Sequence, residues 1–247
     1  LHIGDGAAEL QSLPWELLHD DEVMFSACET TPFSRYLSVE KPWGRPVADR
    51  PIRVLGVIAN PHDVSSRYHL PPLDEDLERY VLASAFAQID PRRIRLTFLK
   101  PPITLERLSR TMLEGYHWLH FVGHGRYNAR QDRVDLLMED ATRGTRAIAD
   151  HLFCRMLAHQ GVQPQLVFLS VCQSAGSSHA GVLTGLAPRL VQIGSTAVVA
   201  MRDRVQMRSA EKITQVFYER LAGHGIVDQA LNRARDALLT AELPGVA

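Results

Sequence analysis

Two apolar runs decide the fold of this chain: Leu119-His120-Phe121-Val122-Gly123-His124-Gly125, and Leu166-Val167-Phe168-Leu169-Ser170-Val171-Cys172-Gln173. Short runs rich in Val, Leu, Ile and Phe are typical of strands buried on both faces of a parallel sheet. We therefore predict strands over 117–122 and 166–170. Each is followed at once by one reactive side chain, His124 after the first strand and Cys172 after the second. Ligands gather at the carboxyl ends of strands in such sheets, so we expect both residues at that edge.

The chain from Arg53 onward alternates between apolar strands and helices that have one apolar face. Further strands are predicted over 54–59, 94–99 and 196–201, with a short extended piece at 136–138, and helices over 74–89, 104–115, 149–159, 210–223 and 227–239. This order predicts an α/β fold with a mostly parallel sheet and helices on both faces. Because residues 1–50 carry several chain-breaking prolines, we predict an N-terminal extension over 1–50, packed on the core, and a main domain over 51–247.

Composition limits the partners and the surroundings of the protein. Lys and Arg number 27 against 28 Asp and Glu, and this formal net charge of −1 provides no basic surface for releasing phosphate counterions. We expect no direct binding to nucleic acid. The sequence has neither an apolar stretch of the roughly 18 residues that a membrane span needs nor a secretory signal, so we expect a cytoplasmic protein without membrane contact. It starts at Leu1 rather than Met, and we expect it to be part of a longer protein.

The cysteines and histidines argue against a disulfide framework and against a metal centre. Three cysteines without close pairs are typical of a reducing compartment. There is no CxxC motif, and an extended chain would point His117 and His120 to opposite faces. The Gly-x-x-x-x-Gly-Lys and Gly-x-Ser-x-Gly motifs are absent too. We therefore expect no cofactor and no metal, and no serine hydrolase of the α/β type.

His124 and Cys172 have the chemistry of a cysteine peptidase dyad. A thiol attacks a carbonyl only as thiolate, and the ordinary cysteine pKa of ~8.5 leaves little of it ionised at neutral pH. A histidine within hydrogen-bond reach serves as base before the attack and as acid toward the leaving amine afterwards. The spacing of the two residues is close to the ~50 residues found in one His-then-Cys protease family. Backbone N–H groups stabilise an oxyanion in such sites, and Gly125 and Cys172 are the candidates.

These residues also have simpler interpretations. A cysteine at a strand end is more often a small buried side chain than a nucleophile. The segment Gly123-His124-Gly125 is also typical of a turn, in which glycines let the chain leave a strand sharply. The occurrence of both features at neighbouring strand ends favours the dyad. The remaining candidates are assigned structural roles: His120 next to the dyad strand, Cys154 in the core, Cys28 in the extension and His179 in a solvated loop.

Several segments together resemble the CHAT domain family, which is related to caspases and separases. They are the two apolar runs above, Leu13-Pro14-Trp15-Glu16-Leu17-Leu18, Leu136-Leu137-Met138-Glu139-Asp140, Ala197-Val198-Val199-Ala200-Met201, and, in the last two helices, Phe217-Tyr218, Ala230-Leu231 and Ala234-Arg235. The resemblance implies a caspase-haemoglobinase fold, a dyad of His124 and Cys172, and cleavage of a protein substrate. It also implies control by a fused or associated sensor domain or subunit, in bacterial defence or cell-death pathways.

One departure from the caspases concerns the choice of cleavage site. The segment Val171-Cys172-Gln173-Ser174 is not the caspase Gln-Ala-Cys-x-Gly signature, so a preference for cleavage after aspartate does not carry over. We hypothesise that Asp203, with Gln173, lines the primary pocket and selects a basic residue, because a carboxylate pairs with Arg or Lys. A solvated loop charge is the alternative for Asp203. The alternative for the whole chain is a non-catalytic CHAT-fold domain that serves in signalling or as a scaffold.

Overall fold

The computed structural model describes residues 10, 13–36, 47, 50–128, 130–131, 133–173, 185–201 and 206–244, with the backbone alone at positions 172, 173 and 207. The chain divides into two compact units. One combines Leu1–Ser38, Tyr80–Asp90 and Asp203–Ala247, and the other combines Val39–Arg79 and Pro91–Arg202. The units group segments that are distant in the sequence. The boundary expected between residues 50 and 51 stays a prediction.

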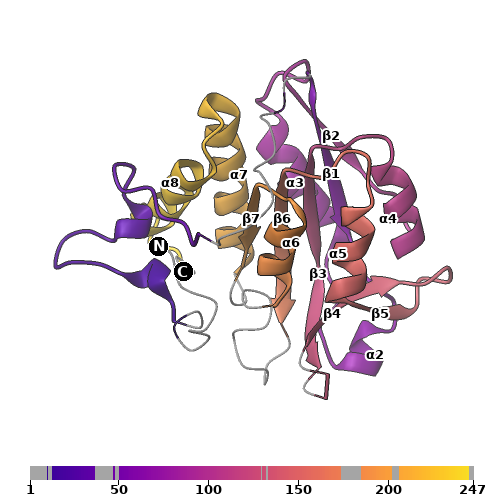
Figure 1. The fold of residues 1–247 in the computed structure, drawn as a ribbon. Coiled ribbons are helices and arrows are strands. Elements are labelled where there is room, and N and C mark those ends of the chain that lie inside the picture. Colours follow the sequence, from indigo (N-terminus) through magenta and orange to yellow (C-terminus); the bar gives the residue numbers. More distant parts are fainter. Residues whose placement is uncertain are drawn as a thin grey trace. The chain divides into compact units, whose positions relative to one another are not determined.

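In the residues that the structure describes, the second unit is built on a mixed sheet of seven strands, of which five are parallel in the order β2-β1-β3-β6-β7 (Figure 1). The strands are β1 (Ile52–Ile58), β2 (Ile94–Phe98), β3 (Trp118–Asn128), β4 (Arg133–Glu139), β5 (Thr145–Ala149), β6 (Leu166–Gln173) and β7 (Ala197–Ala200). The antiparallel hairpin of β4 and β5 follows β3 and pairs with its second half. The expected α/β fold with a mostly parallel sheet is confirmed.

β3 is the strand on which the sheet branches. Its first half pairs with β1, up to the partners Ile58 and Val122. Its second half pairs with β4, starting with the partners His124 and Leu137. β6 lies along the opposite edge of β3, from Trp118 to Gly125. His124 therefore lies at the point where β4 replaces β1 as the neighbour of β3.

Helices cover both faces of this sheet. Those of the second unit are α2 (Val64–Tyr68), the start of α3 (Glu75–Phe86), α4 (Leu105–Met112), α5 (Asp150–Ala158) and α6 (Ala187–Ile193). α4, α5 and α6 pack on one face (Figure 1). Phe121 and Phe153 are fully buried there in the main core cluster. On the other face α2 packs against Leu137, and the Arg79 guanidinium of α3 lies 4.5 Å from the centre of the Phe98 ring.

Local sequence signals set the ends of two of these helices. The Thr104 side chain caps α4 by accepting a hydrogen bond from the Arg107 N–H at 3.1 Å, as expected for a threonine just before the first turn. α6 ends at Gly194, whose φ of 120° is open to glycine but strained for other residues. An added Cβ there would also meet Gln163 Oε1. Thr104 therefore marks the start of α4, and Gly194 marks the end of α6.

The first unit joins the two ends of the chain. It contains η1 (Trp15–Leu17), η2 (Phe25–Ala27), the second part of α3, α7 (Met207–His224) and α8 (Val227–Thr240). Asn232 of α8 is fully buried, and its Nδ2 donates to the carbonyl oxygens of Phe25, Cys28 and Thr31 at 3.3, 2.7 and 2.9 Å. Hydrogen bonds to backbone carbonyls therefore hold the N-terminal segment on α8.

The structure corrects the predicted strand ends around the two reactive residues. β3 continues to Asn128 and β6 to Gln173, beyond the predicted ends at 122 and 170. His124 and Cys172 thus lie inside paired strands rather than just after them. The structure also contains α2, β5 and α6, which the sequence analysis did not predict. In the described part of the chain, no helix combines the length and the apolar character required to cross a membrane.

Candidate active site

The parallel pairing of β3 with β6 defines the site. His124 and Cys172 are register partners in this pairing. Neighbouring strands lie about 4.8 Å apart, and paired positions of parallel strands face the same side of a sheet. Positions 124 and 172 are therefore nearest neighbours on one face. The two residues were expected at neighbouring strand ends, and the structure places their backbones side by side.

His124 is buried beside an apolar cluster. Only 2% of the surface of this residue is exposed to solvent. Its partner in β4 is Leu137, which forms a small buried cluster with Val64 and Leu70, and Tyr68 packs against this cluster. The segment of α2 and Leu70 that follows β1 thus packs on the β4 partner of His124.

The glycines on both sides of His124 have a packing role. A Cβ on Gly123 would lie 2.8 Å from Cε1 of Phe121, and one on Gly125 would lie 2.7 Å from Cγ1 of Val171. Carbon atoms in contact normally stay about 3.5–4.0 Å apart. Both glycines belong to β3 and neither has a positive φ, so the alternative interpretation of this segment as a turn is wrong. They let two large side chains pack over β3 on the face opposite His124.

A buried carboxylate fixes the point where β4 replaces β1. Glu139, at the end of β4, is fully buried and accepts hydrogen bonds from the N–H groups of Ile103 at 2.9 Å and Asn60 at 3.3 Å. The Arg143 guanidinium donates to it through Nε and Nη2, both at 3.2 Å, and also pairs with Glu75 of α3. The end of β1, the end of β4 and the start of α3 are thereby joined beside the strand that carries His124.

A charged group lies further along the same face. Arg126 follows His124 by two residues in β3 and is the register partner of Asp135 in β4. The Asp135 carboxylate is buried and accepts hydrogen bonds from Arg133 Nε at 2.8 Å and from Asn128 Nδ2 at 3.2 Å. Arg126 and Asp135 were not among the residues predicted from the sequence. The signal that would have found it is the two-residue period of a strand, continued past His124.

Burial shifts the pKa values of His120 and Cys154, whereas hydrogen bonding shifts that of Cys28. His120 is buried, its ring stacks on Phe168 with centroids 4.6 Å apart, and burial lowers its pKa to about 3, so it is neutral at pH 7. Burial raises the pKa of Cys154 to about 12, which leaves it an unreactive core residue as expected. Cys28 differs, because a hydrogen bond with the Thr30 hydroxyl lowers its pKa.

The remaining predicted site residues are only partly described. Asp203 and His179 lie outside the described residues, and Gln173 is known by its backbone as the register partner of Gly125. Gly125 and Cys172 lie in paired strands, where N–H groups lie in the plane of the sheet, so their oxyanion role stays a prediction.

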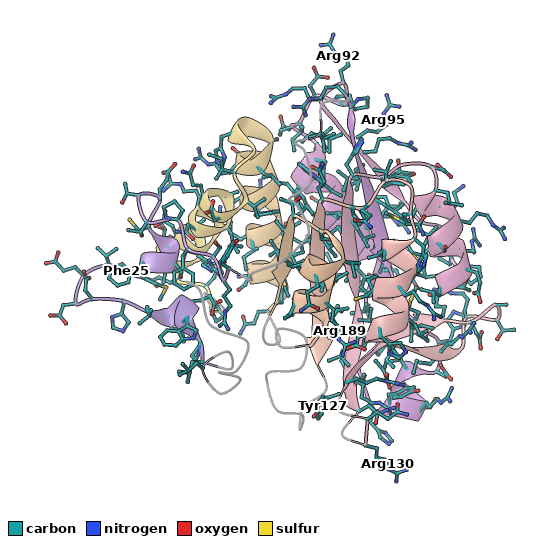
Figure 2. The ribbon with its side chains drawn as sticks, in the orientation of Figure 1. Phe25, Arg92, Arg95, Tyr127, Arg130 and Arg189 are labelled. Atoms are coloured by element: carbon teal, nitrogen blue, oxygen red, sulfur yellow. The ribbon has the colours of Figure 1, made fainter. Side chains whose placement is uncertain are left out.

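Among the residues that the structure describes, no three His, Cys, Asp or Glu side chains come together as a metal site would require. Figure 2 marks Tyr127 and Arg130 at the hairpin end of β3 and β4, and Arg189 on α6.

Comparison with known families decides to which group this arrangement belongs. The model of the family described as the CHAT domain matches residues 3–244. The chain belongs to the CHAT domain family. The resemblance noted in the sequence is therefore confirmed, and the match extends over both units of the CHAT domain.

Two solved structures are similar to this CHAT domain, and the first of them shares its fold. The complex of Porphyromonas gingivalis RgpB pro- and mature domains matches with a TM-score of 0.50 and 14% identity, over 78% of this chain and 44% of that chain. The Arg-specific cysteine proteinase gingipain R (RgpB) matches with a TM-score of 0.46 and 15% identity, over 76% of this chain and 42% of that chain. The CHAT domain thus spans less than half the length of these structures. The expected caspase-like fold class is confirmed. No curated protein sequence gives a significant match.

Proposed function

We propose that this CHAT domain is a cysteine endopeptidase in which Cys172 is the nucleophile and His124 its acid and base. The observation that carries the proposal is the register of β3 and β6, which makes the two residues direct partners. Partners in neighbouring strands have Cα atoms about 4.8 Å apart, a spacing that lets a histidine ring and a thiol on one face meet. The fold is shared with a protein that is itself a cysteine proteinase.

The proposed reaction has two halves. In the first, the Cys172 thiol passes its proton to His124, and the thiolate attacks the carbonyl carbon of the scissile peptide bond. The negative charge on the carbonyl oxygen is stabilised by the N–H groups of Gly125 and Cys172. The C–N bond then breaks, and His124 returns the proton to the leaving amine. In the second half, His124 deprotonates a water molecule, which hydrolyses the thioester and releases the acid and the free thiol.

The wider role that we propose follows from the family. The substrate is a protein, and Gln173 and Asp203 line the primary pocket and favour a basic residue there. A fused or associated sensor domain or subunit controls the activity, in a bacterial defence or cell-death pathway. The formal net charge of −1 argues against direct nucleic-acid binding. The free thiols of Cys28 and Cys154 suit a cytoplasmic setting.

The first test is cleavage of a mixed peptide library followed by mass spectrometry. We expect cleavage by the wild-type protein, its loss in Cys172→Ala, and a rate reduced at least 100-fold in His124→Gln. Cys154→Ala is the matched control, because it removes a cysteine that is buried and has a raised pKa. Cleavage that persists in Cys172→Ala would refute the assignment of the nucleophile.

A second test separates catalysis from scaffolding. If the family function is carried by the fold alone, a full-length protein with His124→Ala should support every function of the intact system. The proposed peptidase predicts that this variant loses the downstream response while it keeps its partners. Full function in His124→Ala would therefore favour the non-catalytic alternative.

A further inference from the structure

The alternation of side chains along β3 places a guanidinium next to the proposed dyad. Arg126 lies two residues beyond His124, which puts the two Cα atoms about 7 Å apart on one face of the sheet. We infer that Arg126 binds the carboxylate of an acidic substrate residue close to the scissile bond. The inference rests on the proposed function and names a residue that determines specificity.

The guanidinium is held in place by an aromatic ring. The Arg126 Cζ lies 5.2 Å from the centre of the Tyr68 ring, within the range of a cation–π interaction. Tyr68 packs against the cluster that contains Leu137, the β4 partner of His124. A continuous set of contacts therefore runs from the guanidinium to the histidine position.

The segment that carries the ring is itself anchored to the sheet. Asp63, just before α2, accepts a hydrogen bond from the Thr145 N–H at 2.6 Å, and Arg67 Nη1 donates to the Thr145 carbonyl oxygen at 2.9 Å. Both bonds tie α2 to the start of β5. Because Tyr68 belongs to this anchored helix, the ring forms a fixed support for the Arg126 guanidinium.

The guanidinium keeps hydrogen-bonding capacity for a ligand. Its nearest carboxylate oxygen, Asp135 Oδ2, lies 3.6 Å from Nη2, which is longer than a hydrogen bond. Both oxygens of Asp135 already accept from Arg133 and Asn128. Among the residues that the structure describes, Arg126 Nε has no hydrogen-bond partner. Nε is itself buried, so any donors that a ligand can reach are those of Nη1 and Nη2.

Exposure and charge favour an anionic occupant. The Arg126 side chain is 41% exposed, so a substrate group can reach it. Two guanidinium groups, those of Arg126 and Arg133, face the single carboxylate of Asp135, which leaves an excess positive charge. A carboxylate is the side-chain group that matches a guanidinium in shape and charge. An extended substrate places alternate side chains about 7 Å apart, which matches the distance from His124 to Arg126.

The test reads the effect of Arg126 through alkylation of Cys172 and does not require turnover. The probes are chloroacetyl-capped tripeptides that carry Glu or Gln at the first, second or third position, and labelling of Cys172 is followed by mass spectrometry. We expect one position at which the Glu probe labels wild-type protein at least 10-fold faster than the Gln probe. Arg126→Gln should bring this ratio close to 1, and Arg126→Glu should favour a Lys probe instead.

The control is Arg146→Gln, which makes the same charge change at an exposed arginine of β5 that pairs with Glu106. It should keep the wild-type ratio. Equal labelling by Glu and Gln probes at every position, in a protein whose library cleavage depends on Cys172, would overturn this inference and leave the proposed function intact. Loss of the ratio in both Arg126→Gln and Arg146→Gln would also overturn it, because the effect would then be one of overall charge. Failure of both cleavage and Cys172 alkylation would overturn the proposed function together with the inference.

Discussion

Replacing Gly125 with alanine inserts one methyl group between β3 and β6, directly behind the proposed dyad. The new Cβ would lie 2.7 Å from Cγ1 of Val171, so one of the two strands has to move by about 1 Å to restore a normal contact. Val171 is buried and β-branched, and it has little freedom to rotate away. Overpacking of this kind lowers the free energy of unfolding by about 1–3 kcal/mol.

The same displacement should affect the chemistry. Val171 directly precedes Cys172, so a shift of β6 moves the nucleophile position away from His124. A misplacement of about 1 Å costs roughly 100-fold in rate. We therefore expect Gly125→Ala to label at Cys172 with iodoacetamide up to about 100-fold more slowly, and to unfold at a lower urea concentration than wild type.

A double-mutant cycle isolates the contact. Val171→Ala removes the clashing carbon and on its own costs about 2 kcal/mol through the lost methyl groups and the cavity. The double variant Gly125→Ala/Val171→Ala should be more stable, by at least 1 kcal/mol in the free energy of unfolding, than the sum of the two single changes predicts. It should also restore the rate of iodoacetamide labelling at Cys172. Gly161→Ala is the control, because an added Cβ there meets nothing within 4 Å. Additive effects, or a Gly125→Ala protein as stable as the control, would refute the packing argument.

Three further predictions concern buried polar groups. Burial lowers the pKa of His120 from 6.5 to about 3, so at pH 5 the unfolded chain takes up a proton that the folded chain excludes. This residue should lower the free energy of unfolding by about 2 kcal/mol between pH 8 and pH 5. In urea titrations, His120→Phe should abolish this part of the pH dependence. A pH dependence that is the same in the variant and in wild type would contradict the assignment. Glu139→Gln should lower the free energy of unfolding by about 3–5 kcal/mol, because it removes the buried charge that pairs with Arg143, and a loss below 1 kcal/mol would show that the network is not needed. Asn232→Asp keeps the shape of the side chain but removes the amide that donates to three backbone carbonyls, so hydrogen exchange over residues 25–31 should become faster. The control change Asp236→Asn on the same helix should leave this exchange unchanged. Equal exchange in the two variants would count against the role of Asn232.

The sequence was sufficient for the strands and helices with a strong apolar pattern. β6 and the first half of β3 are apolar runs, and α4 has a threonine cap at its start. Such signals are local, so they can be recognised without the tertiary structure. The same applies to Cys154, whose helical neighbours are apolar and which lies in the core.

Other elements depend on contacts that a single sequence does not display. β5 is a short strand with two exposed residues at its centre and pairs, in the described part of the sheet, with β4 alone. α2 has five residues in a loop, too few for a helical period to be recognised. The extension of β3 past His124 was hidden because Gly123 and Gly125 are typical of turns. The glycines instead leave room for two side chains on the opposite face, that of Phe121 in the same strand and that of Val171 in β6. The contact with Val171 is a tertiary one.

The sequence singled out His124 and Cys172 as candidates but did not show the register of their strands. Spacing along the chain suggested His124 and Cys172, whereas their pairing depends on how β6 aligns with β3, and a shift of one residue would put them on opposite faces. Arg126 and Asp135 were missed for the same reason. Their proximity follows from the β3–β4 hairpin register, which places them as partners.

The most direct test of the central claim is the pH dependence of iodoacetamide labelling at Cys172. It should be measured in a Cys28→Ser background, because the hydrogen bond with Thr30 lowers the pKa of Cys28 and makes it a competing thiol. The proposed dyad predicts an apparent pKa of Cys172 well below the ordinary ~8.5, and a return toward that value in His124→Gln. A Cys172 thiol that titrates near 8.5 in both proteins would contradict it.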